Sequence, residues 1–289
     1  SQRISSGAEI ISAQKTRQEM LIWTDTSLHA MRFTGPPFTF GISMLANNVS
    51  ILGPNAVTTV GDKVFWMDRE NFYVYTGRVQ VIPCTLLRYV FDDINLDQSF
   101  KCFAASNKMF DEVFWFYPTA GSDEIDRYVK FNFTENTWDL GTLSRTAWVD
   151  YGIHDNPRGS GVADSVNYIY IHELGQNNDG SAMTPFIESA DFDLGDGDHF
   201  MFMSRLVPDI SITDTSGDSS GTVDYIVKTR NYPGDSLATN STNSVTTTTQ
   251  QAFVRARSRQ AVMRIQSAST DLAWTLGDLR LDLRPDGRR

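Results

Sequence analysis

The sequence is poor in cysteine and histidine, and these shortages exclude several kinds of chemistry. Its 289 residues include two cysteines, Cys84 and Cys102, too few for a disulfide framework or a cysteine-based zinc cluster. They fit reduced core residues, and a single bridge between them is the alternative. None of the four histidines has a second histidine three or four residues away, so the sequence predicts no zincin-like metal site and no cofactor.

Signatures of two common enzyme classes are also missing. The chain has no glycine-rich phosphate loop with a following lysine and no dinucleotide fingerprint. Two pairs of adjacent carboxylates, at residues 111–112 and 123–124, flank one hairpin of the sequence. Adjacent residues of a strand point to opposite faces, so neither pair alone supplies the geometry of a glycosidase. We predict that the protein is not an enzyme.

Long apolar runs are absent, and the charge is unevenly distributed. No run of about 18 apolar residues occurs, so no membrane-spanning segment is predicted. The net charge of −10 argues against a general binder of nucleic acid or anionic membranes, because the summed field repels phosphate. Residues 251–289 carry eight arginines and four aspartates, a charge of +4, whereas the other 250 residues carry −14. A basic tail on an acidic body predicts docking to an acidic neighbour.

Similar hairpin phrases recur along the first part of the chain. Residues 20–33, 64–75 and 113–133 each show an apolar run, a polar turn and a second alternating run, which is the pattern of a β-hairpin. A fourth, shorter copy lies at residues 167–172. The aromatic runs inside these phrases are typical of strands that are buried on both faces between stacked sheets.

The spacing of the tryptophans in these phrases points to one architecture. Trp23, Trp66 and Trp115 hold equivalent places, 43 and 49 residues apart, and repeats of about 40–50 residues are typical of β-propeller blades. We therefore predict an all-β fold with propeller blades in residues 1–190; an irregular β-sandwich is the alternative. The chain starts at Ser1 without an initiator methionine, so we expect a piece of a longer protein that supplies the missing blades, or a processed product.

The remainder, residues 191–289, is predicted to be a C-terminal β-rich domain that ends in the basic tail. Alternating segments at residues 200–210, 222–228 and 253–265 indicate a small β-sandwich or an extended sheet. Residues 239–249 are rich in threonine, serine and asparagine, which predicts a loop. Helical periodicity is scarce, and residues 88–101 are the best short candidate.

Two groups of charged residues are candidate sites. Asp191, Asp193, Asp196 and Asp198 could ligate calcium through carboxylate oxygens, but they lack the EF-hand order, and a solvated turn is the alternative. Alternation places the arginines at 255, 257 and 259 on one strand face, where they could pair with a neighbour's carboxylates or with aspartates of the same chain. The candidate docking residues are Arg255, Arg257, Arg259, Arg264, Arg280, Arg284, Arg288 and Arg289.

Several longer phrases carry a family resemblance. They are KTRQE and LIWTD at residues 15–19 and 21–25, FTGPPFTFG at 33–41, GPNA at 53–56, YVFDDIN at 89–95, EIDRY at 124–128, ES at 188–189, DFDLGDGD at 191–198 and RPDGRR at 284–289. Together they resemble virion structural proteins of short-tailed bacteriophages, the tail hub or nozzle type also called tail tubular protein B. Members of that family are much longer than this chain.

The resemblance implies both a fold and a role. The fold would be a β-propeller joined to further β-domains. The protein would be assembled in the host cytoplasm and would form a ring, six-fold in the family, in the tail of the virion. That ring would prolong the channel through which DNA leaves, next to an adaptor and to fibres or spikes. Acidic channel walls would repel phosphate and let the duplex slide.

Two other functions are compatible with a propeller. A carbohydrate- or receptor-binding propeller without catalysis would bind sugar through an exposed tryptophan. A glycosidase would release sugar and would lose this activity when one Asp or Glu is replaced. The tail protein is our first hypothesis, and sugar binding is the second.

Overall fold

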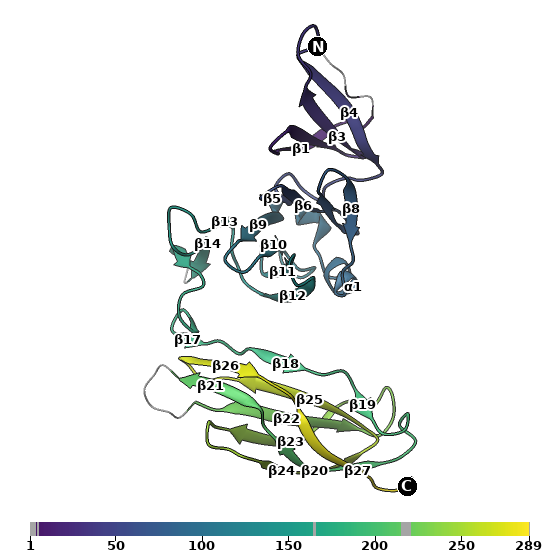
Figure 1. The fold of residues 1–289 in the computed structure, drawn as a ribbon, viewed down its shortest axis with the longest axis vertical. Helices are drawn as coiled ribbons and strands as arrows, with labels where there is room; N and C mark the ends of the chain where they lie inside the picture. The colour runs from purple at the N-terminus through teal and green to yellow at the C-terminus, as the bar shows by residue number, and fades with distance from the viewer. Residues whose placement is uncertain (1–3, 5, 164–165, 215–220, 289) are drawn as a thin grey trace. The chain divides into compact units, whose positions relative to one another are not determined.

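The chain folds almost entirely into β-strands (Figure 1). The computed structural model describes residues 4, 6–163, 166–214 and 221–288. Its strands form several antiparallel sheets, so the predicted all-β class is confirmed. The chain divides into two compact units, Ser1–Leu174 and Gly175–Arg289, which we call unit 1 and unit 2. This division lies earlier in the chain than the boundary predicted between residues 190 and 191.

Unit 1 begins with three consecutive four-stranded sheets, in which each strand pairs antiparallel with the next one in the sequence. The hairpins predicted at residues 20–33, 64–75 and 113–133 are the middle strand pairs of these sheets and are confirmed. The first sheet contains β1 (Ile10–Lys15), β2 (Glu19–Thr24), β3 (Ser27–Phe33) and β4 (Phe40–Asn47). The second contains β5 (Val57–Val60), β6 (Lys63–Met67), β7 (Phe72–Tyr75) and β8 (Val79–Ile82). The third contains β9 (Phe103–Asn107), β10 (Glu112–Tyr117), β11 (Arg127–Asn132) and β12 (Thr137–Thr142).

A fourth sheet of three strands completes unit 1. It contains β13 (Ala147–Val149), β14 (Arg158–Ala163) and β15 (Val166–Ile171), in that order. β15 covers most of the predicted fourth copy at residues 167–172, which is therefore a single strand and not a complete hairpin phrase.

The predicted helix at residues 88–101 is interrupted. The structure has two short helices there, α1 (Leu87–Phe91) and the 3-10 helix η1 (Leu96–Lys101). The Asn95 side chain accepts a hydrogen bond from the Asp97 backbone N–H at 3.1 Å and caps the second helix. Asparagine favours such N-cap positions over helix interiors, which explains the break.

The first strands of successive sheets lie side by side. β1 lies against β5, β5 against β9, and β9 against β13. Gln14 Nε2 on β1 donates to Thr59 Oγ1 on β5 at 2.9 Å, and Trp148 Nε1 on β13 donates to the Ser106 carbonyl oxygen on β9 at 3.0 Å. The four sheets are therefore joined in series along their first strands. Within the described residues the sheets close into neither a barrel nor a ring.

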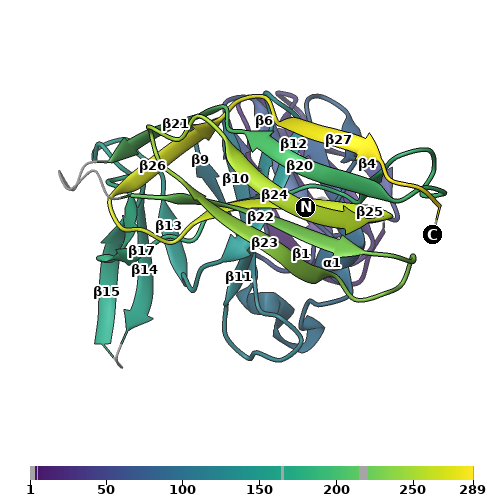
Figure 2. The same cartoon turned by 90° about the horizontal axis from the view of Figure 1, so that it is seen from below.

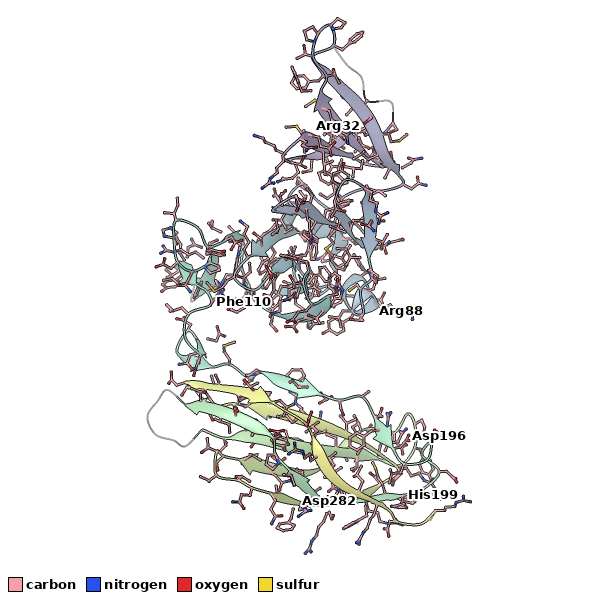
Figure 3. All side chains as sticks on the ribbon, in the orientation of Figure 1. Arg32, Arg88, Phe110, Asp196, His199 and Asp282 are labelled. Carbon is pink, nitrogen blue, oxygen red and sulfur yellow. The ribbon has the colours of Figure 1, made fainter. Side chains whose placement is uncertain are left out.

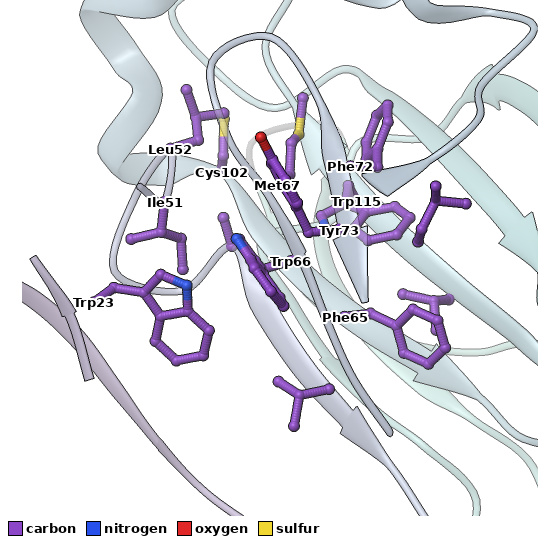
Figure 4. Packing of buried hydrophobic residues seen from close by; sticks show 14 of the residues in the cluster. Trp23, Ile51, Leu52, Phe65, Trp66, Met67, Phe72, Tyr73, Cys102 and Trp115 are labelled. Atoms are coloured by element: carbon purple, nitrogen blue, oxygen red, sulfur yellow. The ribbon is translucent and has the colours of Figure 1, made fainter. Parts of the chain in front are cut away.

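The repeated tryptophans form the centre of the unit 1 core (Figure 4). Trp23, Trp66 and Trp115 lie on β2, β6 and β10, and each is at most 1% exposed. The rings of Trp23 and Trp66 meet edge to face with centroids 5.4 Å apart, and Trp115 lies 4.8 Å from the ring of Phe72 on β7. The predicted burial of the aromatic runs between sheets is confirmed. Such large rings fill the space between layers, which explains why the repeat is visible in the sequence.

Unit 2 has two antiparallel sheets that share one hydrophobic core. One sheet has the strand order β18-β25-β22-β23, with β19 also paired to β25, and the other has the order β24-β20-β27. The core draws on both, with Val227 and Ile265 from the first sheet and Met203 and Val254 from the second. The two short pairs β16–β17 and β21–β26 complete the unit. The strands are β16 (Asn177–Asn178), β17 (Ser181–Ala182), β18 (Phe186–Glu188), β19 (Phe192–Asp193), β20 (Met201–Val207), β21 (Ile210–Asp214), β22 (Val223–Arg230), β23 (Ala238–Val245), β24 (Ala252–Ser258), β25 (Gln260–Ser267), β26 (Leu272–Leu276) and β27 (Arg280–Pro285).

The loop predicted at residues 239–249 is wrong over most of its length. Residues 238–245 form β23, an edge strand that pairs with β22 along nearly its whole length. Its side chains are mostly exposed, and Val245 at its end is buried in the core. The backbone hydrogen bonds to β22 hold this polar segment in the sheet, and threonine is well suited to an exposed strand position.

Candidate functional site

The clearest functional feature is one exposed face of the sheet β24-β20-β27. On β24 burial alternates strictly: Val254 and Ala256 point into the core, whereas Phe253, Arg255 and Arg257 are exposed. The prediction of one basic strand face therefore holds for residues 255 and 257. Phe253 shares that face and is 69% exposed.

The neighbouring strands extend this face on both sides of β20 (Figure 2). Phe202 on β20 stands opposite Arg257 on β24 and Arg284 on β27, and Arg205 stands opposite Phe253 and Asp282. Residues directly opposite in an antiparallel pair lie on the same face of the sheet. We call this set the arginine face: Phe202, Arg205, Phe253, Arg255, Arg257, Arg280, Asp282 and Arg284.

Some arginines of this face are held in place by carboxylates of the same chain. Arg205 Nε donates to Asp282 Oδ2 at 2.7 Å, and Arg257 Nε donates to Asp286 Oδ2 at 2.6 Å. Arg280 lies 3.4 Å from a carboxylate oxygen of Asp209. These pairs are exposed, so each contributes only about 0–1 kcal/mol to stability. They fix the side chains in position more than they stabilise the unit.

Other arginines of the face are free of carboxylate partners. Arg255 forms no hydrogen bond or ion pair with any residue that the structure describes. The Arg284 guanidinium lies over the Phe202 ring, 4.8 Å from its centroid. A guanidinium keeps its charge and its fork of N–H donors while it stacks on a ring. Arg255 and Arg284 can therefore still bind an incoming carboxylate with two hydrogen bonds.

The acidic turn proposed for calcium is instead paired with arginines. A carboxylate oxygen of Asp191 accepts a hydrogen bond from Arg230, and Asp198 lies 3.2 Å from a guanidinium nitrogen of Arg288. Arg259 donates to the backbone oxygen of Asp198 at 2.9 Å. In the described part of the chain, no three His, Cys, Asp or Glu side chains are grouped to hold a metal ion.

The remaining two aspartates of the turn lie apart from these ion pairs. Asp193 is on β19, paired with Gln260 of β25. Asp196 is in the turn itself, where its positive φ of 55° fits an acidic turn residue. Figure 3 places Asp196 near His199 at one end of unit 2 and Asp282 farther along the unit. The structure thus brings one of the four predicted calcium ligands, Asp198, together with two arginines of the predicted docking set, Arg259 and Arg288.

The other predicted docking arginines lie outside the arginine face. Arg264 is on β25 of the other sheet, where it lies 3.4 Å from Glu188 and 3.8 Å from the centroid of the Phe186 ring. Hydrogen bonding from Lys228, and also from Arg264, holds the pKa of Glu188 below its usual value. Arg259 and Arg288 lie at the acidic turn described above. Arg289 lies outside the described residues.

The carboxylate pairs considered for glycoside hydrolysis have structural partners. Lys130 Nζ lies 2.8 Å from Glu112 Oε1; burial opposes the Lys130 charge, but the hydrogen bond and charge of Glu112 raise its pKa overall. Asp111 is a turn residue with a positive φ of 56°. Lys101 Nζ donates to Glu124 at 2.7 Å and to the Asp123 backbone oxygen at 2.6 Å. These contacts fit roles in turns and strand pairs.

Sequence reasoning missed four members of the arginine face, Phe202, Arg205, Phe253 and Asp282. Phe253 has the same alternation phase as Arg255 and could have been included. Arg205 could not, because a β-bulge between Met203 and Arg205 shifts the strand register by one residue, and Phe202 could not, because its pairing with Arg257 and Arg284 joins distant segments. Such a bulge changes which residues share a face and leaves no mark in the alternation of the sequence.

Comparisons with known proteins do not identify the chain. The sequence matches no protein-family model and no curated protein.

Among the described helices, none is both long and apolar enough to cross a membrane.

Proposed function

We propose that this protein is a structural component of the tail of a short-tailed bacteriophage, and that it has no catalytic role. The observation that carries the proposal is the arginine face, an exposed sheet surface that combines aromatic rings with unpaired guanidinium groups. Aromatic residues and arginine are the residues most enriched at the centres of protein interfaces. The sequence motifs that resemble tail hub or nozzle proteins indicate the kind of assembly in which this surface would dock.

In this proposal unit 1 is part of a β-propeller, and its four sheets are consecutive blades. Support comes from the four-stranded meanders that follow one another in the sequence and from the first strands that lie side by side from sheet to sheet. In a propeller the first strand of each blade faces the central channel and adjoins the first strands of the neighbouring blades. Three equivalent buried tryptophans are the packing expected between such blades.

The proposed role is that of one subunit in a ring, six-fold by the resemblance, which extends the channel for DNA ejection. The arginine face would dock to an acidic surface of an adaptor, a fibre or spike, or a neighbouring subunit. The rest of the chain is acidic, and an acidic channel wall would repel the DNA backbone and let it pass without binding. The protein would be assembled in the host cytoplasm and retained in the virion.

Immunogold electron microscopy tests this proposal most directly. Antibody raised against this chain would be applied to particles from the same source, and gold clustered at a short tail is the expected result. Particles that stay unlabelled while the antigen remains soluble would overturn the tail role. A glycan array with the same protein tests the second hypothesis, a carbohydrate-binding propeller, which requires binding of a sugar. The exposed tryptophan expected for such binding is not found, because all six tryptophans are buried or half-buried.

A further inference from the structure

The last strand of unit 1 has an uncovered edge. In the first three sheets the third strand pairs with a fourth, as β3 does with β4, β7 with β8 and β11 with β12. β15 is the third strand of the fourth sheet, and it has no further strand beside it among the residues that the structure describes. No residue of β7 or β11 is exposed and only two of the seven residues of β3 are, whereas five of the six residues of β15 are exposed.

The composition of β15 makes this edge open to another strand. Its residues Val-Asn-Tyr-Ile-Tyr-Ile include no charge, no proline and no glycine, and its register with β14 is regular over all six pairs. Tyr168 is 48% exposed on one face and Ile169 is 72% exposed on the other. Proteins normally protect edge strands with charges, prolines, bulges or short length, because a bare edge pairs with other chains.

A second uncharged edge lies at the other end of the sheet series. β4 is the outer strand of the first sheet, and its eight residues, Phe-Gly-Ile-Ser-Met-Leu-Ala-Asn, include no charge and no proline. Its pairing with β3 has one irregularity, at Leu45, and is regular from Phe40 to Met44. Met44 in its middle is 50% exposed. The other outer edges of unit 1 are protected, since β12 carries Asp139 and β8 is only four residues long.

We propose that β15 of one copy pairs edge to edge with β4 of a second copy of this chain. Backbone hydrogen bonds would supply affinity, as in other cases of strand addition, and the exposed apolar side chains on both strands would be buried on the two faces of the joined sheet. Neither strand carries a charge that would be buried without a partner. The two edges belong to different sheets of unit 1 and are not paired with each other within one chain.

This contact is heterologous, because it joins two different surfaces of the same molecule. Contacts of this kind repeat head to tail and give a closed ring or an open filament. The inference rests on unit 1 alone and does not depend on the tail role or on the arginine face of unit 2. Self-association that persists in an Arg255→Glu variant therefore separates it from docking through that face.

Disulfide cross-linking between single-cysteine additions tests the pairing. Ile169→Cys and Met44→Cys place thiols on the two edges, and Ser43→Cys samples the opposite face of β4. Burial raises the pKa of Cys84 to about 11 and that of Cys102 to about 12, so the native thiols stay protonated and react slowly. Under mild oxidation we expect a linked heterodimer from Ile169→Cys mixed with at least one β4 variant, and little linkage from each variant alone.

Sedimentation velocity with charged variants provides the second measurement. Ile169→Lys places a charge on the bare edge and should weaken self-association about tenfold or more, because pairing would leave that charge without a partner. Val81→Lys on β8 is the matched control: Val81 is 53% exposed on another edge strand, and association should be unchanged.

Three results would overturn the inference. Linkage of Ile169→Cys with itself at the efficiency of the mixture would mean that β15 pairs with β15. A chain that sediments as a monomer at every concentration would mean that the two edges do not join copies of this chain. Equal weakening by Ile169→Lys and Val81→Lys would mean that the charge, and not the edge, is responsible.

Discussion

The three equivalent tryptophans should respond differently to the same substitution. All three are buried to the same degree, but their indole N–H groups differ. Trp66 Nε1 donates to the Ser50 carbonyl oxygen at 3.1 Å, whereas Trp23 Nε1 and Trp115 Nε1 are buried without a hydrogen-bond partner among the described residues. Replacement by phenylalanine removes that N–H and part of the ring in each case, so the comparison isolates the hydrogen bond.

The expected sizes follow from these partners. Loss of ring volume costs roughly 1–2 kcal/mol at each site. Trp66→Phe also leaves the Ser50 oxygen without its donor, which adds about 1 kcal/mol, for a total of about 2–3 kcal/mol. In Trp23→Phe and Trp115→Phe the removal of an unpaired buried donor offsets about 1 kcal/mol or more of the packing loss, so the net change is about 0–1 kcal/mol.

Differential scanning calorimetry of the whole chain measures these changes. For a unit of this size, each kcal/mol lowers the unfolding temperature by about 2–4 °C, so Trp66→Phe should lower the unit 1 transition by about 5–10 °C. The other two variants should lower it by no more than about 4 °C. If Trp23→Phe and Trp115→Phe destabilise the protein as much as Trp66→Phe, the reasoning from hydrogen-bond partners is refuted.

Three further predictions concern charge. Arg255→Glu should leave the unfolding temperature unchanged, because Arg255 has no described partner, but should reduce incorporation of the protein into particles about tenfold or more, measured by immunoblot against Arg255→Lys. Glu19→Gln weakens the hydrogen bonds that Glu19 accepts from Tyr75 and from Arg32, and urea denaturation should show a loss of about 1–3 kcal/mol; no loss would contradict a role for these contacts. Burial, together with the Arg145 charge, lowers the pKa of His172 to about 4. The folded protein therefore favours the neutral imidazole, and the contribution of His172 to the free energy of unfolding should be fully present above about pH 6.5. It should fall by about 1–2 kcal/mol as the pH drops toward 4. His172→Gln should remove part of this dependence in pH-dependent urea denaturation, and an unchanged slope would contradict the assignment.

Local patterns predicted the middle of each sheet well and its edges poorly. The hairpins around Trp23, Trp66 and Trp115 were readable because both of their strands are apolar and alternate around a polar turn. Outer strands such as β23 carry polar residues and are held by hydrogen bonds to a neighbour, so composition alone predicted a loop there. What is missing is the identity of the distant segment with which each outer strand pairs, and the local pattern of a single sequence does not show it.

The same limit applies to the candidate site, where the decisive property is which arginines remain free. The sequence allows the arginines of the C-terminal segment to be counted, and its alternation places Arg255 on an exposed face. Partner choice is non-local: Arg288 pairs with Asp198, and Arg264 pairs with Glu188. Pairing within the chain therefore reduces a basic tail to a smaller surface, centred on Phe253 and Arg255. An aromatic ring beside an unpaired guanidinium is the combination on which interface energy usually concentrates, so we expect docking to depend on these two residues more than on the net charge of the tail.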